Sequence, residues 1–384
     1  MRILYIAPRF HTNQADLMRS WIEHGDEVRM LVRYIGKSED HSMLIPDLCE
    51  YSKGSIALFK GYRILRRNDE HNDCFLLRFG IPNARKIREY LRNFSPDLVI
   101  LREKSMYSIV CYRECGKLGI PALTYNQSPL YHFRDDVSRE DLLHKYVDRH
   151  MPPIRITPVH YKDWEERKKC TRREETDWFV PFIVSPPGSS QDRDYFRDNM
   201  INILEIGKFE RRKNHLLMIR AFQKVYQRNT KVRLTIAGEV SNDFHKAYYQ
   251  EVMKYIHEQK LDSIVRVRCN VPYVKMGDVY RESDVYVLSS SGEPAAYSIL
   301  EAMAYGLPAI SSSENGTADY TIPGETGDIF LSGDEDDLVA KLMKIIENPD
   351  RLIQMGQNAY CHVQREYSFD NYLKALRKIP GIHI

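Results

Sequence analysis

Short apolar runs alternate with amphipathic stretches along the first part of the chain. The run ILYIAP (3–8) ends in proline and predicts a buried parallel strand. The pattern over 14–24 predicts a helix that ends at Gly25, and EVRMLV (27–32) predicts the next strand. The alternation continues with a basic helix over 82–93, a strand over 97–101, a helix over 106–117 and a strand over 121–125. Strands that alternate with helices predict a parallel sheet covered on both faces.

The middle of the chain is less regular. Residues 129–150 are polar, IRITPV (154–159) predicts a short strand, and a highly charged helix is predicted over 161–175. The next segment, VPFIVSPPGSSQDRD (180–194), is rich in Pro, Gly and Ser. This composition is typical of an interdomain linker.

The strand–helix rhythm then returns. Strands are predicted at 201–207, 232–238, 264–268, 285–289 and 308–311, and helices at 214–228 and 243–259. The predicted fold class is α/β, with two Rossmann-like doubly wound domains that face a central cleft. We expect these domains over 1–185 and 201–365, a linker over 186–200, and a final helix within 366–384 that packs back towards the first domain.

Length and composition agree with a soluble protein of two domains. The chain has 384 residues, of which 43% are hydrophobic and 28% charged. The start turns polar after a few apolar residues, and no apolar run approaches the roughly 20 residues of a membrane-spanning helix. The seven cysteines are scattered, and Cys111 and Cys115 lack a second pair that would complete a zinc site. We therefore expect free thiols and a cytoplasmic location.

The net charge of +3 hides a basic segment. Residues 51–100 hold ten basic and five acidic side chains. The basic ones form two clusters, Lys60, Arg63, Arg66 and Arg67, and Arg85, Lys86, Arg88 and Arg92. One interpretation is a solvated basic face, and the other is a patch for anionic lipid headgroups or a phosphate-bearing acceptor. Nucleic acid is not an expected partner, because no recognised binding module accompanies the charge.

The strongest chemical signal is DVYVLSSSGEPAAYSILEAMAYGLPAISS (284–312). A strand is predicted to end at Ser289 and a helix to begin near Pro294, with Glu293 in the loop between them and Glu301 about two turns into the helix. The backbone amides of Ala295, Ala296, Tyr297 and Ser298 then form an anion site for a diphosphate. Glu293 can accept hydrogen bonds from sugar hydroxyls, and Glu301 from a ribose diol. The alternative is that Glu293 caps the helix and that Glu301 is a surface residue.

A second signal is LEIGKFERRKNHLLMIRAF (204–222). A strand ends at Gly207, a basic loop follows, and an amphipathic helix begins at Asn214 or His215. Lys208 and Lys213 are the candidate counter-charges for a diphosphate. The alternative is that the run from Arg211 to Lys213 is an exposed turn.

These segments resemble the signature of retaining GT-B glycosyltransferases of family 4, the glycosyl transferases group 1. The two glutamates are separated by seven residues, EAMAYGLPAI is similar to the family's Glu-Ala-Met-Ala-x-Gly-x-Pro-Val-Ile, and 207–213 resembles its Gly-Arg-x5-Lys loop. The resemblance implies that Glu293 lies near the donor hexose and that Glu301 holds the nucleotide ribose. The family usually has Phe-Gly after the first Glu-Pro, where this chain has Ala295-Ala296, and Lys208 replaces the usual arginine.

Further positions are carried by the same resemblance. SSSENGTADYTIPGETGDIF (311–330) is similar to the family's Gly-Gly-x-x-Glu segment, with Asp319 in place of the glutamate. Its alternatives are a turn that packs against the donor loop and a direct donor contact. Apart from the resemblance, the nucleotide base is expected to stack in the cleft of the carboxyl-terminal half, near Arg268–Val271.

The amino-terminal half matches the family less well. The loop after the first strand, PRFHTNQ, is not glycine-rich, and Arg9 and His11 are candidates for phosphate or acceptor contact. Where the family commonly has a histidine facing the anomeric centre, counting from Pro121 leads to Gln127. Glutamine can hydrogen-bond a sugar hydroxyl, but it cannot transfer a proton. A structural role is the alternative for each.

Together these observations predict retaining transfer of a hexose-type sugar from a nucleoside diphosphate, UDP favoured over GDP, to an acceptor hydroxyl. The catalytic candidates are Glu293, Lys208 and Lys213, and no cofactor or divalent metal is expected, since no convincing Asp-x-Asp loop is present. The acceptor is expected to be a carbohydrate or lipid-linked carbohydrate of a bacterial surface polysaccharide or glycoconjugate, bound by the first domain. Peripheral contact with the inner face of the plasma membrane is a further expectation. The alternatives are a nucleotide-sugar 2-epimerase of the same fold, or a non-catalytic nucleotide-sugar-binding partner subunit.

Overall fold

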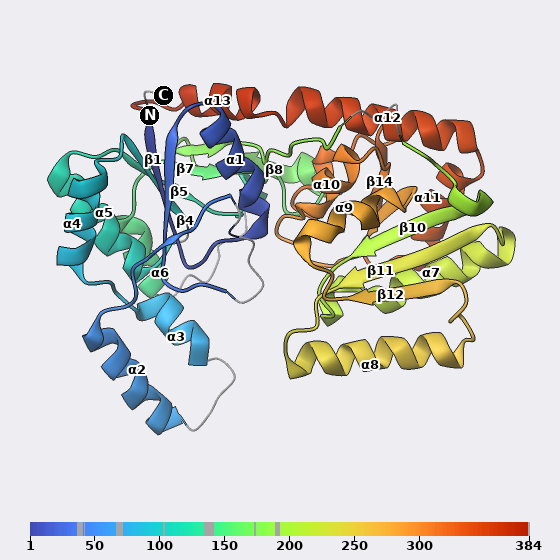
Figure 1. Cartoon of the computed structure of the whole chain (residues 1–384), viewed down its shortest axis with the longest axis horizontal. Coiled ribbons are helices and arrows are strands. Elements are labelled where there is room, and N and C mark those ends of the chain that lie inside the picture. The colour runs from blue at the N-terminus through green and yellow to red at the C-terminus, as the bar shows by residue number, and fades with distance from the viewer. Residues whose placement is uncertain are drawn as a thin grey trace.

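The computed structural model describes residues 1–36, 41, 43–66, 72–102, 104–133, 142–172, 174–188 and 193–382. Its two parallel sheets lie side by side, each covered by helices (Figure 1). This confirms the predicted α/β architecture of two doubly wound domains.

The first sheet has seven strands in the order β3-β2-β1-β4-β5-β7-β9, all parallel. Its strands are β1 (Arg2–Ala7), β2 (Glu27–Val32), β3 (Asp47–Leu48), β4 (Leu98–Arg102), β5 (Ala122–Tyr125), β7 (Arg155–Thr157) and β9 (Asp177–Phe179). The strand order reverses between β1 and β4. Ligands of such sheets bind beyond the carboxyl ends of the strands at this reversal.

The helices of this half are α1 (Ala15–Glu23), α2 (Lys53–Arg66), α3 (Asn72–Phe79), α4 (Ala84–Phe94), α5 (Met106–Leu118) and α6 (Leu142–His150). Local chemistry sets some of their ends: the Asn83 side chain caps α4, and Gly119 ends α5 with a left-handed φ of 68°. The hydrophobic pattern did not predict α2 and α3. In α2 apolar residues lie on two faces, which blurs the helical periodicity.

The helix predicted over 161–175 is wrong. The chain forms a 3-10 turn at Arg167–Lys169 and then β8 (Cys170–Arg172), which pairs antiparallel with β6 (Tyr131–Phe133). Pairing with β6 satisfies the backbone groups of β8 instead.

The second sheet has six parallel strands in the order β12-β11-β10-β13-β14-β15. They are β10 (Ile201–Ile206), β11 (Val232–Gly238), β12 (Val265–Cys269), β13 (Val285–Leu288), β14 (Ala309–Ser312) and β15 (Gly327–Phe330). The helices of this half are α7 (His215–Arg228), α8 (Asp243–Glu258), α9 (Tyr273–Arg281), α10 (Ser298–Ala304), α11 (Glu335–Ile346), α12 (Pro349–Glu366) and α13 (Phe369–Arg377). The strand order reverses between β10 and β13, so the loops after these two strands meet.

The segment predicted as a linker is packed rather than loose where the structure describes it. Val180 and Ile183 are buried in the core of the first domain, and Phe182 and Val184 in that of the second. The Arg193 guanidinium donates to the carbonyl of Tyr305 over 2.5 Å. Apolar burial on both sides of this crossing holds the two domains together.

The chain returns to the first domain at its end. The helices α12 and α13 run along one side of the molecule across both domains (Figure 1). Tyr372, Leu373 and Leu376 of α13 are buried in the core of the first domain. The bounds 1–185, 186–200, 201–365 and 366–384 stay a prediction. Among the described residues, no helix has the length and apolar character needed to cross a membrane.

Candidate functional site

Glu293 lies in the loop between β13 and α10, where the order of the second sheet reverses. Its N–H donates to the carbonyl of Glu314 over 2.9 Å, and its carbonyl accepts from the N–H of Gly316 over 3.0 Å. A Cβ at Gly316 would lie 2.0 Å from the carbonyl oxygen of Pro294, so a larger residue cannot take its place without moving the backbone. The loop is therefore fixed to the segment after β14, and Glu293 is only 9% exposed.

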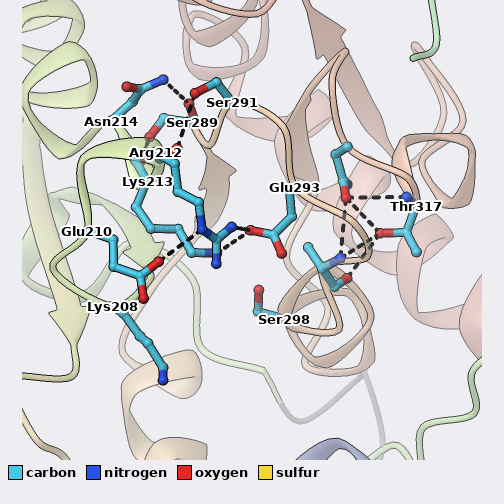
Figure 2. A network of polar contacts seen from close by, with 12 residues as sticks. Lys208, Glu210, Arg212, Lys213, Asn214, Ser289, Ser291, Glu293, Ser298 and Thr317 are labelled. Atoms are coloured by element: carbon cyan, nitrogen blue, oxygen red, sulfur yellow. Dashed lines mark hydrogen bonds and ion pairs between the residues drawn. The ribbon is translucent and has the colours of Figure 1, made fainter. Parts of the chain in front are cut away.

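Two cations from the loop after β10 hold the Glu293 carboxylate (Figure 2). Arg212 Nη1 lies 2.7 Å from Glu293 Oε2, and the Lys213 ammonium contacts the same oxygen. Arg212 also pairs with Glu210 over 2.9 Å. Partial burial opposes ionisation of Arg212, but the carboxylates of Glu293 and Glu210 outweigh it and raise its pKa. The carboxylate is thus oriented before any ligand binds.

The basic run is divided between two environments. Lys213 is 12% exposed and faces Glu293, whereas Arg211 is exposed and pairs with Glu251 of α8 over 2.7 Å. The exposed-turn alternative therefore describes Arg211. Arg212, which was not among the predicted site residues, contacts Glu293 directly, and the run of three basic residues was its only signal in the sequence.

Lys208 lies apart from this cluster. It extends away from the cluster in Figure 2, and its ammonium lies 3.4 Å from a carboxylate oxygen of Glu239, at the end of β11. Although partial burial raises the pKa of Glu239, the Ser241 hydroxyl and Lys208 lower it further. The two predicted lysines therefore contact different carboxylates, Lys208 that of Glu239 and Lys213 that of Glu293.

The loop after β1 brings His11 towards the second domain. Burial, together with the charges of Arg102, Arg9 and Lys208, lowers the pKa of His11 to about 3. His11 is neutral at pH 7, and positive charge from both domains surrounds it. This arrangement favours an anionic ligand between the loops that follow β1 and β10.

A buried polar network underlies the loops after β10 and β13. Glu205, inside β10, contacts His215 Nδ1 over 2.9 Å and accepts from the Ser289 hydroxyl. His215 Nε2 lies 3.1 Å from the carbonyl of Lys208, and the Asn214 amide donates to the carbonyl of Ser289 over 3.2 Å. The network links the two loops. Its signal in the sequence was a single glutamate within an apolar strand.

The helix predicted to start near Pro294 begins at Ser298 instead. The Ala296 N–H donates to Thr317 Oγ1 over 3.1 Å, so it is already occupied. The chain between the loop and α10 is therefore not helical, and this contact uses a side chain in place of a helical hydrogen bond. The amides at 295–298 therefore do not form one uniform helix end.

The side chains on either side of Ala296 contact the first domain or stay within the second domain. The Tyr297 hydroxyl donates to Asp16 Oδ2 of α1 over 2.9 Å, across the domain boundary. Ser298 Oγ lies 2.7 Å from the Tyr286 hydroxyl, and Ala295 is half-buried. Tyr297 thus connects the donor loop to the first domain.

Glu301 lies in the first turn of α10, not two turns into it. Its Oε2 accepts from the Tyr280 hydroxyl over 3.0 Å. Burial raises the pKa of Glu301 to about 7, helped by the charge of Asp16 and opposed by the Tyr280 hydrogen bond. The carboxyl group therefore titrates near neutral pH.

Arg268 and Asp319 each have an ionic or polar partner. The Arg268 guanidinium contacts Glu282 at the end of α9. Asp319 Oδ2 lies 2.5 Å from His160 Nδ1 of the first domain, and the His160 ring stacks on Phe179 at 3.6 Å. Asp319 is thus an interdomain contact in this structure.

The remaining predicted residues lie in the first domain, beyond the ends of its strands. Gln127 follows β5, and its amide nitrogen lies 3.5 Å from the Tyr125 hydroxyl. Arg9 lies in the loop after β1. Within the described parts of the chain, no three His, Cys, Asp or Glu side chains gather in a way that would hold a metal ion.

Comparisons with known proteins agree with this geometry. Residues 192–362 match the family model of glycosyl transferases group 1. The lipopolysaccharide core biosynthesis mannosyltransferase LpcC of Rhizobium leguminosarum bv. viciae is 24% identical over 170 residues, 44% of this chain and 47% of that protein. A D-inositol 3-phosphate glycosyltransferase of Corynebacterium kroppenstedtii is 27% identical over 187 residues, 46% of this chain and 41% of that protein. The match thus spans less than half the length of these relatives.

Solved structures cover nearly the whole chain. A glycosyltransferase from Rickettsia africae ESF-5 superposes with a TM-score of 0.71 at 15% identity, over 97% of this chain and 96% of the other. Anabaena Alr3699/HepE in complex with UDP and glucose gives a TM-score of 0.71 at 13% identity, over 98% of each chain. At such identities the likeness shows the fold alone, which is GT-B. The chain thus has the GT-B fold, and its residues 192–362 are similar to the glycosyl transferases group 1 family.

Proposed function

We propose that the protein transfers a hexose-type sugar from a nucleoside diphosphate to an acceptor hydroxyl with retention of anomeric configuration. The observation that carries this proposal is the Glu293 carboxylate, held by Arg212 and Lys213 where the order of the second sheet reverses. A carboxylate fixed there can bind sugar hydroxyls while the adjacent cations meet a diphosphate.

Departure of the nucleoside diphosphate is the demanding step, because negative charge builds up on its phosphates. Lys213 lies beside Glu293, and Lys208 lies farther out with His11 across from it. Preorganised cations stabilise such charge without reorganising during the reaction. We assign Glu293, Lys208 and Lys213 to catalysis and propose no cofactor and no divalent metal.

The other donor-binding roles are proposals too. Glu301, as a carboxylate, would accept from the ribose diol, and its half-ionised state near pH 7 makes that contact dependent on pH. Within the donor loop, the N–H groups of Ala295, Tyr297 and Ser298 remain the candidates for phosphate contact. Arg268 is kept near the base. Asp319 takes the alternative role, packing between the domains.

Related proteins support the choice of substrates. The Anabaena structure of the same fold holds UDP and glucose, which favours a UDP donor over a GDP donor. LpcC is a lipopolysaccharide core mannosyltransferase, which supports an acceptor from a bacterial surface polysaccharide or glycoconjugate. We place this acceptor against the first domain, near Arg9, His11 and Gln127. We also propose a cytoplasmic location.

One alternative rests on departures from the family pattern, and a second is another enzyme of the same fold. Ala295-Ala296, Lys208 and Gln127 each replace a usual family residue. A non-catalytic nucleotide-sugar-binding subunit would tolerate these changes, and it would bind UDP without turnover. A 2-epimerase of the same fold would convert the donor without an acceptor.

A screen of nucleotide sugars tests the proposal. The purified protein is heated with each donor, and the donors that raise its melting temperature are incubated for slow hydrolysis. We expect one UDP-sugar to give both effects, because a bound donor stabilises the folded state. Stabilisation without release of sugar would favour the binding subunit, and no stabilisation by any nucleotide sugar would contradict the proposal.

A further inference from the structure

Helix α2 presents apolar residues to solvent. Leu58 is 72% exposed and Ile64 is 80% exposed, and Ala57 and Gly61 between them are exposed as well. At 100° per residue these positions fall on one side of the helix. They form a stripe, Ala57, Leu58, Gly61 and Ile64, that we call the outer stripe of α2.

The opposite side of α2 packs against the protein. Ser55 is buried, and Ile56 and Phe59 are half-buried. The Ser55 hydroxyl accepts from the N–H of Ile81 over 3.0 Å. The helix is therefore attached through its inner side, and packing within the chain does not account for the apolar character of its outer stripe.

The charge of α2 has one sign. Its sequence KGSIALFKGYRILR contains no acidic residue. Lys53, Lys60 and Arg63 are exposed, and neither lysine forms an ion pair with any residue that the structure describes. On the helical wheel Lys53 and Lys60 lie beside one edge of the outer stripe. Arg67, which belonged to the predicted basic cluster, lies outside the described residues.

Two other exposed helices differ from α2. In α4 the basic groups are partly neutralised, since Arg85 pairs with Glu89 over 3.2 Å and Arg88 with Glu114 over 2.6 Å. In α8 an exposed Phe244 is accompanied by acidic residues, and Lys254 pairs with Glu258 over 3.7 Å. Only α2 of these three combines an apolar stripe with charge of one sign. Of the two predicted basic clusters, the first is therefore the better membrane candidate.

We propose that α2 docks the protein on an anionic lipid bilayer. Leu58 and Ile64 enter the boundary between headgroups and acyl chains, and Lys53 and Lys60 lie at the headgroups. The inference deepens the peripheral membrane contact expected from the sequence, and its purpose, access to a lipid-linked acceptor, rests on the proposed function.

A bilayer fits this surface better than a protein does. From Ala57 to Ile64 the stripe is about 10 Å long and about 10 Å wide, which gives an area on the order of 100 Å², far short of the roughly 800 Å² per partner in a stable interface. In a symmetric contact between two copies, Lys53 and Lys60 of one helix would face those of the other, which is unfavourable. In Figure 1, α2 lies on the side of the first domain opposite α13. Docking through α2 therefore leaves α13 facing away from the bilayer.

Co-sedimentation of the full-length protein with vesicles tests the proposal. One vesicle preparation is pure phosphatidylcholine and the other contains about 30% phosphatidylglycerol, which supplies the anionic surface. We expect binding to the anionic vesicles alone, weakened at about 0.5 M NaCl relative to about 0.1 M because salt screens the lysines. Equal binding to both preparations, or to neither, would overturn the proposal.

Matched variants assign the binding to the outer stripe. The double variant Leu58→Ser/Ile64→Ser should bind anionic vesicles at least tenfold more weakly than wild type. Val274→Ser on α9, which removes an equally exposed apolar side chain (76%), should bind as wild type. An unchanged melting temperature excludes misfolding of either variant. Unchanged vesicle binding by the double variant would contradict the assignment.

Donor turnover measured without vesicles separates this proposal from the proposed function. Because α2 lies outside the donor site, the double variant should hydrolyse donor at the wild-type rate. If the double variant loses vesicle binding but keeps normal turnover, the docking role is supported. If the wild-type protein binds vesicles but shows no turnover, only the enzymatic proposal is overturned. Sedimentation equilibrium tests whether the outer stripe instead binds a second copy of the protein. A wild-type dimer that becomes a monomer in the double variant would identify that second copy and overturn the lipid proposal.

Discussion

The two positions where the strand order reverses are built differently. Beyond β10 and β13, the Glu293 carboxylate is held by Arg212 and Lys213, and buried Glu205 and His215 support the loops from below. Beyond β1 and β4, neutral His11 lies among positive charges. The carboxyl-terminal site is thus organised for one ligand geometry before binding. The amino-terminal site offers positive charge, which suits the variable acceptor that we propose for that half.

If the chemistry lies in the carboxyl-terminal site, Glu293→Gln should have the largest effect. The substitution removes the charge that Arg212 and Lys213 face and loosens the contact with the sugar. We expect donor turnover to fall by about 10³-fold, the upper range for loss of one preorganised polar group. Turnover is measured as release of nucleoside diphosphate by the purified variant. The control is Glu251→Gln, which removes an exposed carboxylate on α8; near-normal turnover in Glu293→Gln would refute the assignment.

Lys213→Ala and Arg211→Ala sharpen the comparison within the basic run. Lys213 is half-buried against Glu293, whereas Arg211 is exposed and pairs with Glu251. We expect a loss of about 10²-fold in turnover for Lys213→Ala, because a preorganised cation leaves the site. Arg211→Ala should stay within about twofold, as is usual for an exposed ion pair. Equal effects of the two variants would mean that total charge, rather than position, matters.

The pH dependence of donor binding tests Glu301. Its pKa is raised to about 7, so the carboxylate form that accepts from a ribose diol is lost as pH falls through 7. Affinity for a UDP-sugar should therefore be about tenfold weaker at pH 6 than at pH 8, following the ionised fraction. Calorimetry with a UDP-sugar measures the affinity at each pH. A UDP-sugar is used rather than UDP because it has no terminal phosphate that would itself titrate between pH 6 and pH 8.

Two variants check the origin of that dependence. Glu301→Gln should bind weakly and equally at both pH values. Tyr280→Phe removes a hydrogen bond that lowers the pKa of Glu301, so it should move the midpoint to higher pH. A wild-type affinity that does not change between pH 6 and pH 8 would exclude Glu301 as a ribose ligand in its ionised form.

The smallest effect is expected in the amino-terminal half. Gln127→Ala removes one neutral amide near the end of β5. We expect an effect of about threefold on the acceptor KM, which is the worth of one neutral hydrogen bond, and donor hydrolysis without acceptor should not change. A loss as large as that of Glu293→Gln would show that the two halves contribute equally to catalysis.

The sequence was sufficient for the alternation of strands and helices and for the segments that contain Glu293, Lys208 and Lys213. Both are local: hydrophobic period and spacing within about 20 residues carry them. It was not sufficient for the partners of these residues. Whether Lys208 or Arg212 approaches Glu293 depends on how two loops 80 residues apart pack, and the run of three basic residues does not distinguish its members.

Interdomain contacts were also beyond the pattern. Asp319 and His160 are 159 residues apart, and Tyr297 and Asp16 are 281 apart, so no local period connects them. Helix α10 starts later than its proline suggests, because the Ala296 N–H donates to Thr317, which is distant in sequence, rather than to a helical carbonyl. The pair β6 and β8 was missed for a related reason, since each strand has only three residues and needs the other.

The most direct test of the central claim follows the anomeric carbon. The purified protein is incubated with the UDP-sugar that stabilises it, and NMR records the anomeric proton of the first product formed. The account predicts UDP release and a product with the anomeric configuration of the donor, and both should be lost in Glu293→Gln. An inverted product, an epimerised donor, or binding without any turnover would contradict it.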